Sequence, residues 1–155
     1  MKQEPLKNIL PQFIENLKVK GRSPATILAY GTDLTQLTSY LIKNNKILPQ
    51  DVNLTDLEEF RDSLDKDKYT PKTVSRKLNA VKTFFRWLKS ENYLISDPSR
   101  GVSHPKIESS PPKFLSPLEY RALRDVVRTD SRIAAIVELI LQTGIRISEV
   151  ANLKV

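Results

Sequence analysis

The sequence predicts an all-α chain, and three observations support that fold class. Apolar residues recur at three- and four-residue spacing in four stretches before Ile95, which is the period of an amphipathic helix. Nowhere before Ile95 do polar and apolar residues alternate as they would in a strand. At three expected helix starts a proline follows a serine or threonine, a pairing typical of such starts: Ser23-Pro24, Thr70-Pro71 and Ser116-Pro117. Short connections between the four helices then predict a compact bundle.

The first two helices are separated by a glycine and a capped proline. The first carries its apolar face at Leu6, Ile9, Leu10, Phe13 and Leu17. It should end near Lys20-Gly21, because glycine accepts the left-handed conformation of a helix C-terminus. Ser23-Pro24 then starts a second helix that should run to about Asn44, with its apolar stripe at Ile27, Tyr30, Leu34, Leu37 and Leu41.

The next two helices complete the bundle. The third should follow Thr55, which has capping-box spacing to Glu58, and its apolar face is Leu57, Phe60 and Leu64. The fourth begins at Thr70-Pro71, with a stripe at Val74, Leu78, Val81, Phe85 and Leu88. Phe84, Phe85 and Trp87 could stack on bases. Their helical spacing beside the stripe favours a place in the core instead.

The polar side of the fourth helix concentrates positive charge. It holds no acid before Glu91, and its basic residues are Lys72, Arg76, Lys77, Lys82, Arg86 and Lys89. The whole chain has 25 lysines and arginines against 18 acids, a formal net charge of +7. A net positive charge favours a phosphate-rich or other acidic partner. A solvated basic face, which is common, stays open as the alternative.

A linker and a second unit follow the bundle. Residues 97–114 are rich in proline, serine and lysine and show no periodic apolar face. We therefore place domains at 1–96 and 115–155. In the second, Ser116-Pro117 with Glu119 starts one helix, and further helices should cover Ser131–Gln142 and Ile147–Leu153. The Ser131–Gln142 helix is apolar on nearly all sides, so we expect a domain that is truncated at Val155 and needs a larger core.

Several classes of site and location are disfavoured by composition. Cysteine is absent, which excludes disulfides, thiolate zinc sites and cysteine nucleophiles. The one histidine, His104, makes a histidine metal site implausible, and we predict no metal or other cofactor; His104 itself is predicted to be an incidental polar residue of the linker. No apolar run approaches the roughly 18 residues of a membrane helix. With no signal-peptide core near Met1, we expect a cytoplasmic protein without a membrane partner.

The sharpest motif is QTGIRISE, residues 142–149. Gly144 should end the apolar helix, and Arg146 then lies at the start of the next one, where helix amides and the helix dipole favour an anion. The planar guanidinium of arginine can grip two phosphate oxygens. An ordinary surface ion pair between Arg146 and Glu149 is the alternative that these residue types leave open.

Four segments in order resemble one protein family. TGIRISEVANLK is similar to the first conserved box of the tyrosine recombinase (phage integrase) family. GRSPATILAYGTDL and TVSRKLNAVKTFFRWL resemble the family's second and fourth core-binding helices, and FLSPLEYRAL resembles the entry to its catalytic domain. The resemblance implies a four-helix SAM-like core-binding bundle, a linker, and the first helices of a truncated mixed α/β catalytic domain.

The resemblance also implies roles at the QTGIRISE motif. Arg146 matches the family's first catalytic arginine, which stabilises charge on the scissile phosphate in the transition state. Thr143, Gly144 and Glu149 match the supporting residues, and Glu149 is expected to orient the arginine. In the family the full enzyme uses no cofactor, cuts and rejoins duplex DNA through a 3′-phosphotyrosine intermediate, and assembles as four protomers on two sites. The other catalytic residues would lie beyond Val155, so we expect this chain to bind DNA without cleaving it.

For the bundle, the resemblance implies that the second and fourth helices lie against double-stranded DNA. Phosphates or base edges would be contacted by Lys72, Arg76, Lys82 and Arg86, and bases also by Asn79 and Thr83. Helix caps, with phosphate contact as a secondary role, are expected at Ser23, Thr26, Thr70 and Thr73. Two alternatives remain: a stand-alone DNA-binding module without recombinase activity, and a helical protein-interaction domain that binds an acidic partner.

Overall fold

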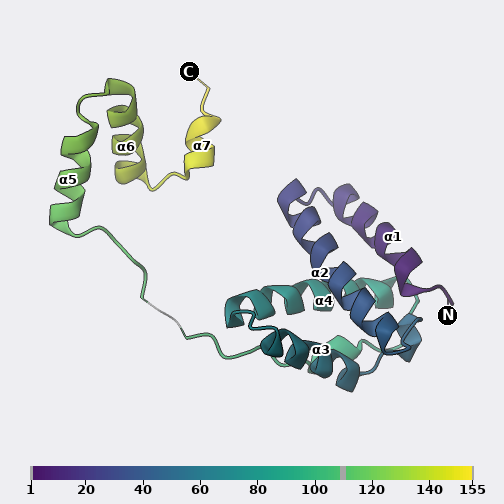
Figure 1. Ribbon diagram of the computed structural model, residues 1–155. Coiled ribbons are helices and arrows are strands. Elements are labelled where there is room, and N and C mark those ends of the chain that lie inside the picture. The colour runs from purple at the N-terminus through teal and green to yellow at the C-terminus, as the bar shows by residue number, and fades with distance from the viewer. Residues whose placement is uncertain (1, 109–110, 155) are drawn as a thin grey trace. The chain divides into compact units, whose positions relative to one another are not determined.

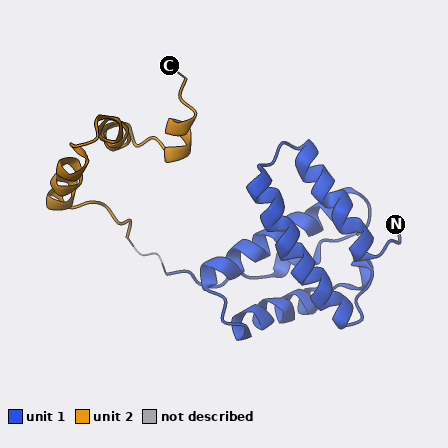
Figure 2. Ribbon diagram, turned by 45° about the horizontal axis from the view of Figure 1, so that its top comes forward, with its two compact units in different colours: residues 1–108 blue, residues 109–155 orange. Residues whose placement is uncertain are grey.

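The computed structural model describes residues 2–108 and 111–154, and every regular element in those two ranges is a helix (Figure 1). The chain divides into two compact units, residues 1–108 and 109–155 (Figure 2). The all-α prediction is therefore confirmed. We describe each unit by itself.

The first unit is a bundle of four α-helices with two short 3-10 turns. The α-helices are α1 (Leu6–Val19), α2 (Pro24–Lys43), α3 (Leu54–Lys66) and α4 (Pro71–Ser90). The 3-10 turns are η1 (Pro49–Asp51) and η2 (Pro98–Gly101). In Figure 1, α4 runs through the middle of the bundle, and α2 crosses it.

Most of the helix boundaries follow the predicted capping residues. The Ser23 side chain accepts from the backbone of Thr26 at the start of α2, and Gly21 has a φ of 67° after α1. The start of α3 differs from the prediction, because Asn53 is the capping residue and Thr55 lies inside the helix. Asn53 and Asp56 form a reciprocal capping box at this start. The Asn53 side chain accepts from the Asp56 backbone at 3.0 Å, and the Asp56 side chain accepts from the Asn53 backbone at 2.8 Å.

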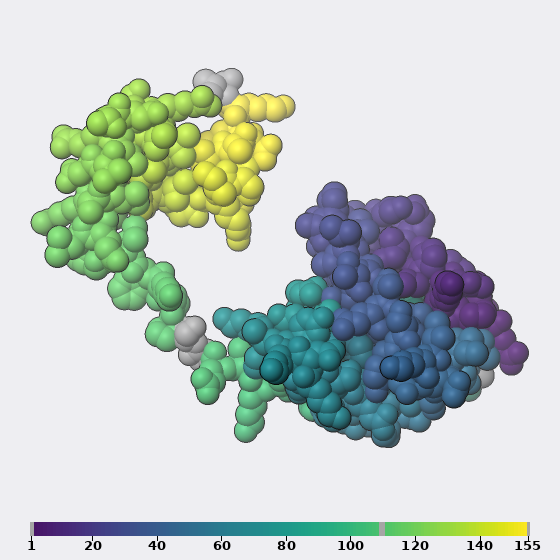
Figure 3. Space-filling model, in the orientation of Figure 1, coloured from purple at the N-terminus to yellow at the C-terminus, as the bar shows by residue number. Residues whose placement is uncertain are grey.

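The hydrophobic core is built around α4. The predicted apolar stripes of α1, α3 and α4 are buried, with only Leu10 partly exposed, and the ring of Phe84 lies 5.1 Å from that of Phe13, edge to face. Trp87 packs on the same Phe13 ring, at 5.3 Å. The aromatic residues of α4 are therefore core residues, as their spacing predicted, and not a stacking surface for bases. In the space-filling view, the side chains of α1 and α2 are in contact (Figure 3).

The segment after α4 belongs to the bundle and corrects the predicted boundary at 96. Asp97 caps η2 through the backbone and hydroxyl of Ser99, which is buried, and Val102 is buried in the core. Gly101 lies so close to α3 that a Cβ atom there would be 2.9 Å from Leu54 Cδ2. The proline and glycine content of this stretch predicted a linker, but its turn is capped and anchored by packing, so the first unit extends to Glu108.

The second unit consists of α5 (Pro117–Val127), α6 (Ser131–Thr143) and α7 (Ile147–Ala151). The predicted capping box at Ser116 is present, and the hydrogen bond from the Ser116 backbone lowers the pKa of Glu119. Gly144, with a φ of 67°, ends α6 as predicted, whereas α7 ends before the predicted Leu153. None of the described residues of this unit is buried, so its apolar side chains remain partly or fully exposed.

Candidate nucleic-acid interface

One face of α4 carries cations and no acids. At 100° per residue, positions 72, 76, 79, 83 and 86 fall along one side of the helix, with 82 at its edge. Lys72, Asn79 and Arg86 are exposed, and Lys82 and Thr83 are half-buried. The Thr83 hydroxyl donates to the Asn79 carbonyl at 2.7 Å, so its proton is used inside the helix. We call these six residues, 72, 76, 79, 82, 83 and 86, the α4 basic face.

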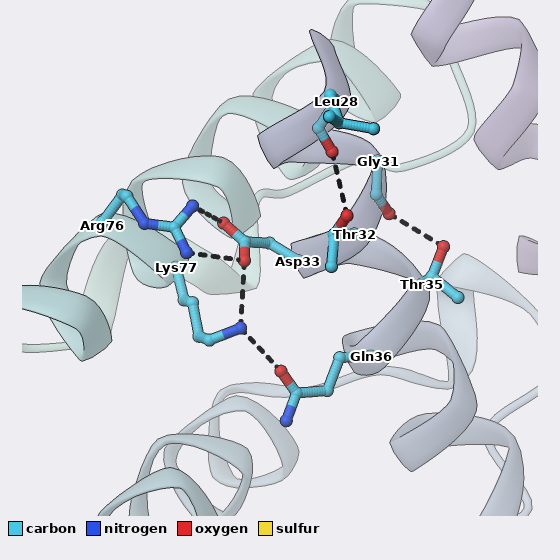
Figure 4. Close-up of polar contacts among 8 residues, drawn as sticks. All are labelled: Leu28, Gly31, Thr32, Asp33, Thr35, Gln36, Arg76 and Lys77. Atoms are coloured by element: carbon cyan, nitrogen blue, oxygen red, sulfur yellow. Dashed lines mark hydrogen bonds and ion pairs between the residues drawn. The ribbon is translucent and has the colours of Figure 1, made fainter. Parts of the chain in front are cut away.

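Arg76 differs from the other cations of the α4 basic face because it is bound to an acid. Its guanidinium pairs with both carboxylate oxygens of Asp33 on α2: Nη1 donates to Oδ2, and Nη2 donates to Oδ1 at 3.0 Å (Figure 4). Asp33 is 2% exposed, whereas the Arg76 side chain is 49% exposed. The arginine therefore reaches from the surface to a buried carboxylate.

Lys77 is not on the solvent-facing side, which corrects the sequence-based description of the helix. It is 5% exposed, and its Nζ donates to Asp33 Oδ1 at 3.0 Å and to Gln36 Oε1 at 2.7 Å (Figure 4). The same Nζ lies 5.0 Å from the centre of the Tyr69 ring. One residue after Arg76 the helix has turned by about 100°, which aims Lys77 at α2.

The predicted caps are present at both helix starts. The Thr70 hydroxyl accepts from the Thr73 backbone at 3.3 Å, and the two hydroxyls lie 3.0 Å apart. Ser23 and Thr26 repeat this arrangement, with 3.2 Å for the backbone bond and 2.8 Å between the hydroxyls. Each hydroxyl keeps acceptor or donor capacity beyond these contacts.

His104 lies against α4, so it is not an isolated residue of a free linker. Its Nδ1 is 3.0 Å from Ser75 Oγ, and the preceding Ser103 accepts from Arg61 of α3 at 2.9 Å. Burial lowers the pKa of His104, and the positive charge of Lys82 lowers it further. A single histidine in a proline-rich stretch has no periodicity, so the sequence held no signal for this contact.

The QTGIRISE motif spans the end of α6, three residues without regular structure and the start of α7, and it brings Arg146 and Glu149 into contact. The Arg146 side chain is 81% exposed, and its Nη1 donates to Glu149 Oε1 at 3.0 Å. The other Glu149 oxygen accepts from the Arg146 backbone at 2.9 Å. The Thr143 hydroxyl donates to the Leu139 carbonyl at 2.6 Å, next to the left-handed Gly144. Glu149 thus binds the Arg146 guanidinium. This exposed ion pair is also the contact that the alternative interpretation of the motif predicted.

The described residues contain no cluster of three histidine or acidic side chains that could hold a metal ion. Within them, no helix is long and apolar enough to span a membrane. The α4 basic face in the first unit and Arg146 in the second each offer hydrogen-bond donors and positive charge.

Comparison with known proteins identifies relatives of this fold. The family model of the phage integrase N-terminal SAM-like domain matches residues 10–92. Tyrosine recombinase XerC of Herpetosiphon aurantiacus is 30% identical over 152 residues, which cover 94% of this chain and 50% of that relative. Tyrosine recombinase XerD of Haemophilus influenzae is 32% identical over 140 residues, covering 88% and 47%. The chain thus spans about half the length of the curated relatives it matches.

Two solved structures are also similar. The crystal structure of XerA recombinase matches with a TM-score of 0.52 and 26% identity, covering 97% of this chain and 50% of that one. The integrase from mycobacterium phage Brujita matches with a TM-score of 0.60 and 17% identity, covering 95% and 49%, and supports the fold alone. Since the SAM-like family model covers more than half of the chain, the chain belongs to the tyrosine recombinase (phage integrase) family.

Proposed function

We propose that this chain is the DNA-binding portion of a site-specific tyrosine recombinase. The observation that carries the proposal is the α4 basic face, where Lys72, Lys82 and Arg86 project from a helix of 20 residues that contains no acid. An α-helix fits the major groove of duplex DNA, and lysine and arginine supply phosphate contacts. The family's name, phage integrase, and the recombinase names of the relatives agree with a DNA substrate.

Within this interface the residues divide by chemistry. Lys72, Lys82 and Arg86 neutralise phosphates and set the position of the helix, while Asn79 can pair with a base edge. Thr83 can accept a hydrogen bond, since its proton is already used. Secondary phosphate contacts come from the hydroxyls at the two helix starts, Ser23, Thr26, Thr70 and Thr73.

Arg146 supports the larger role of the whole protein. In the proposal, a chain of the relatives' length cuts and rejoins duplex DNA through a 3′-phosphotyrosine intermediate and acts as a tetramer on paired sites. Arg146 binds the scissile phosphate there, using the guanidinium donors that Glu149 leaves available. Glu149 orients the arginine, and Thr143 and Gly144 shape the turn before it.

The DNA-binding proposal is tested by the salt dependence of duplex affinity. Removing one phosphate-binding side chain should reduce the slope of log K against log salt by roughly 0.9, because fewer counterions are released. Replacing Lys72, Lys82 and Arg86 together by alanine should therefore flatten the slope. A control that removes the same charge from exposed positions elsewhere, Lys7, Lys43 and Lys66, should leave most of the slope in place.

Two results would contradict the DNA-binding proposal. Equal slopes for the two triple variants would remove α4 from the interface. Absence of duplex binding by the wild-type chain at moderate salt would favour the alternative in which the basic face meets an acidic protein.

The recombinase assignment needs a separate measurement. In a chain of the relatives' length, Arg146→Ala should abolish strand cleavage while site binding stays largely intact, because the arginine acts on the transition state. Cleavage at the wild-type rate would reject its role. A full-length sequence without a nucleophilic tyrosine would instead indicate a stand-alone DNA-binding module.

A further inference from the structure

We propose that Asp33 is a positioning residue of the DNA interface, which holds the guanidinium of Arg76 so that its remaining donors face the duplex. This inference rests on the proposed DNA-binding function and adds to it a buried acid on α2 that lies outside the α4 basic face.

The donor geometry of Arg76 supports this role. A guanidinium has five N–H donors. The two hydrogen bonds from Arg76 to Asp33, which we call the fork, use one donor on Nη1 and one on Nη2. The Nε–H and one hydrogen on each Nη are left, and half of the side chain is open to solvent. One edge of the guanidinium can thus bind a pair of acceptor atoms on DNA while the other end stays on the carboxylate.

The position of Arg76 on α4 makes that edge part of the interface. It is one turn from Lys72 and lies on the same side of the helix as Asn79 and Thr83. An arginine free at this site would sample many rotamers, and fixing them on binding costs affinity. The fork to a buried acid removes that freedom before DNA arrives.

The charge balance explains how an acid is tolerated below a DNA-binding face. Asp33 Oδ1 also accepts from Lys77 Nζ at 3.0 Å, and Gln36 holds the same ammonium at 2.7 Å (Figure 4). One carboxylate is therefore shared by two cations, and the cluster of Asp33, Arg76 and Lys77 carries a net positive charge. The buried Lys77 offsets the carboxylate, so that Arg76 still presents positive charge outward.

A purely structural tie between α2 and α4 is the competing explanation for this cluster. It predicts that Asp33 affects stability and has no specific link to DNA affinity through Arg76. Long-range electrostatics alone also predicts the direction of the change in duplex affinity: removing an acid from beneath a DNA-binding face should strengthen binding. A positioning role for Asp33 predicts the opposite, that its removal weakens duplex binding.

The test is a double-mutant cycle on duplex affinity with Asp33→Asn, Arg76→Ala and the combined variant, all measured where circular dichroism shows them folded. We expect Asp33→Asn to weaken duplex binding, approaching the roughly tenfold loss expected from Arg76→Ala. In the Arg76→Ala background, Asp33→Asn should then have no further weakening effect. Tighter binding by Asp33→Asn, or equal weakening in both backgrounds, would overturn the inference.

Two further variants guard against misfolding. Asp33→Asn leaves Lys77 buried without its carboxylate, so Asp33→Asn with Lys77→Met removes both charges and should restore stability while duplex binding stays weak. Lys77→Met alone keeps the fork to Arg76 and should cost less affinity than Asp33→Asn. Recovery of wild-type affinity in the Asp33→Asn, Lys77→Met protein would also overturn the inference. If the wild-type chain failed to bind duplex DNA, the proposed function itself would fall, which is a different result.

Discussion

At the residue scale, the charges of α4 depend on what lies beside and beneath them. Arg76 and Lys77 are adjacent in the sequence, yet one is half-exposed and the other is buried on Asp33. The positive charge of Lys82 lowers the pKa of His104, which belongs to the segment that follows the helix in the chain. The function of a basic residue here is therefore set by its direction on the helix and by contacts from distant segments.

His104 provides a prediction about pH. Its pKa is lowered in the folded chain by burial and by Lys82, so the unfolded chain binds the proton more readily. Stability should therefore fall as pH drops through the ordinary histidine pKa of about 6.5 toward the lower folded value. Thermal unfolding of the wild type and of His104→Asn, compared at each pH, isolates this small difference. A pH dependence that is identical in the two proteins would exclude His104 as its source.

At the element scale, local signals predicted most of the helices. Proline-linked caps predicted the starts of α2, α4 and α5 to within a residue, because capping is a contact within one turn. The place of η2 could not be predicted in this way, since Gly101 and Val102 are held by contacts with α3 and the core. The pairing of Asp33 with Arg76 and Lys77 was missed for the same reason: it joins two helices across more than forty residues.

The start of α3 offers a prediction with a matched control. Asn53 and Thr55 are both capping residue types, but only Asn53 accepts from the backbone of the helix's first turn. Asn53→Ala should lower the free energy of unfolding by about 1 kcal/mol, because the N–H of Asp56 loses its partner. Thr55→Ala should change it by less than about 0.5 kcal/mol. Chemical denaturation of both variants measures the difference, and a larger loss for Thr55→Ala would reassign the cap.

At the scale of the whole molecule, the two units differ in how much they bury. The first unit has a continuous core that includes Leu34, Phe84 and Leu88, all 0% exposed. In the second, none of the described residues is buried, and α6 keeps its apolar side chains partly exposed. The sequence predicted this contrast, because α6 is apolar on nearly all sides and needs more partners than α5 and α7 provide. The size of the first unit was underestimated, since the burial of Ser99 and Val102 is a tertiary effect.

This contrast predicts separate stabilities for the two units, measurable by amide hydrogen exchange. Protection of an amide requires a helix that stays closed, and helices of 5 to 13 residues without buried contacts open readily. We therefore expect α5, α6 and α7 to exchange orders of magnitude faster than α4, whose amides should exchange only on global unfolding. A chain of residues 1–108 should melt at the same temperature as the whole chain and keep its duplex affinity, because the core and the α4 basic face lie within it.

Exchange in α6 as slow as in α4 would contradict the expected difference in exchange rate and would mean that the apolar side of α6 is covered in solution. Repeating the measurement at several protein concentrations would then identify a second copy as the cover, since its protection would rise with concentration.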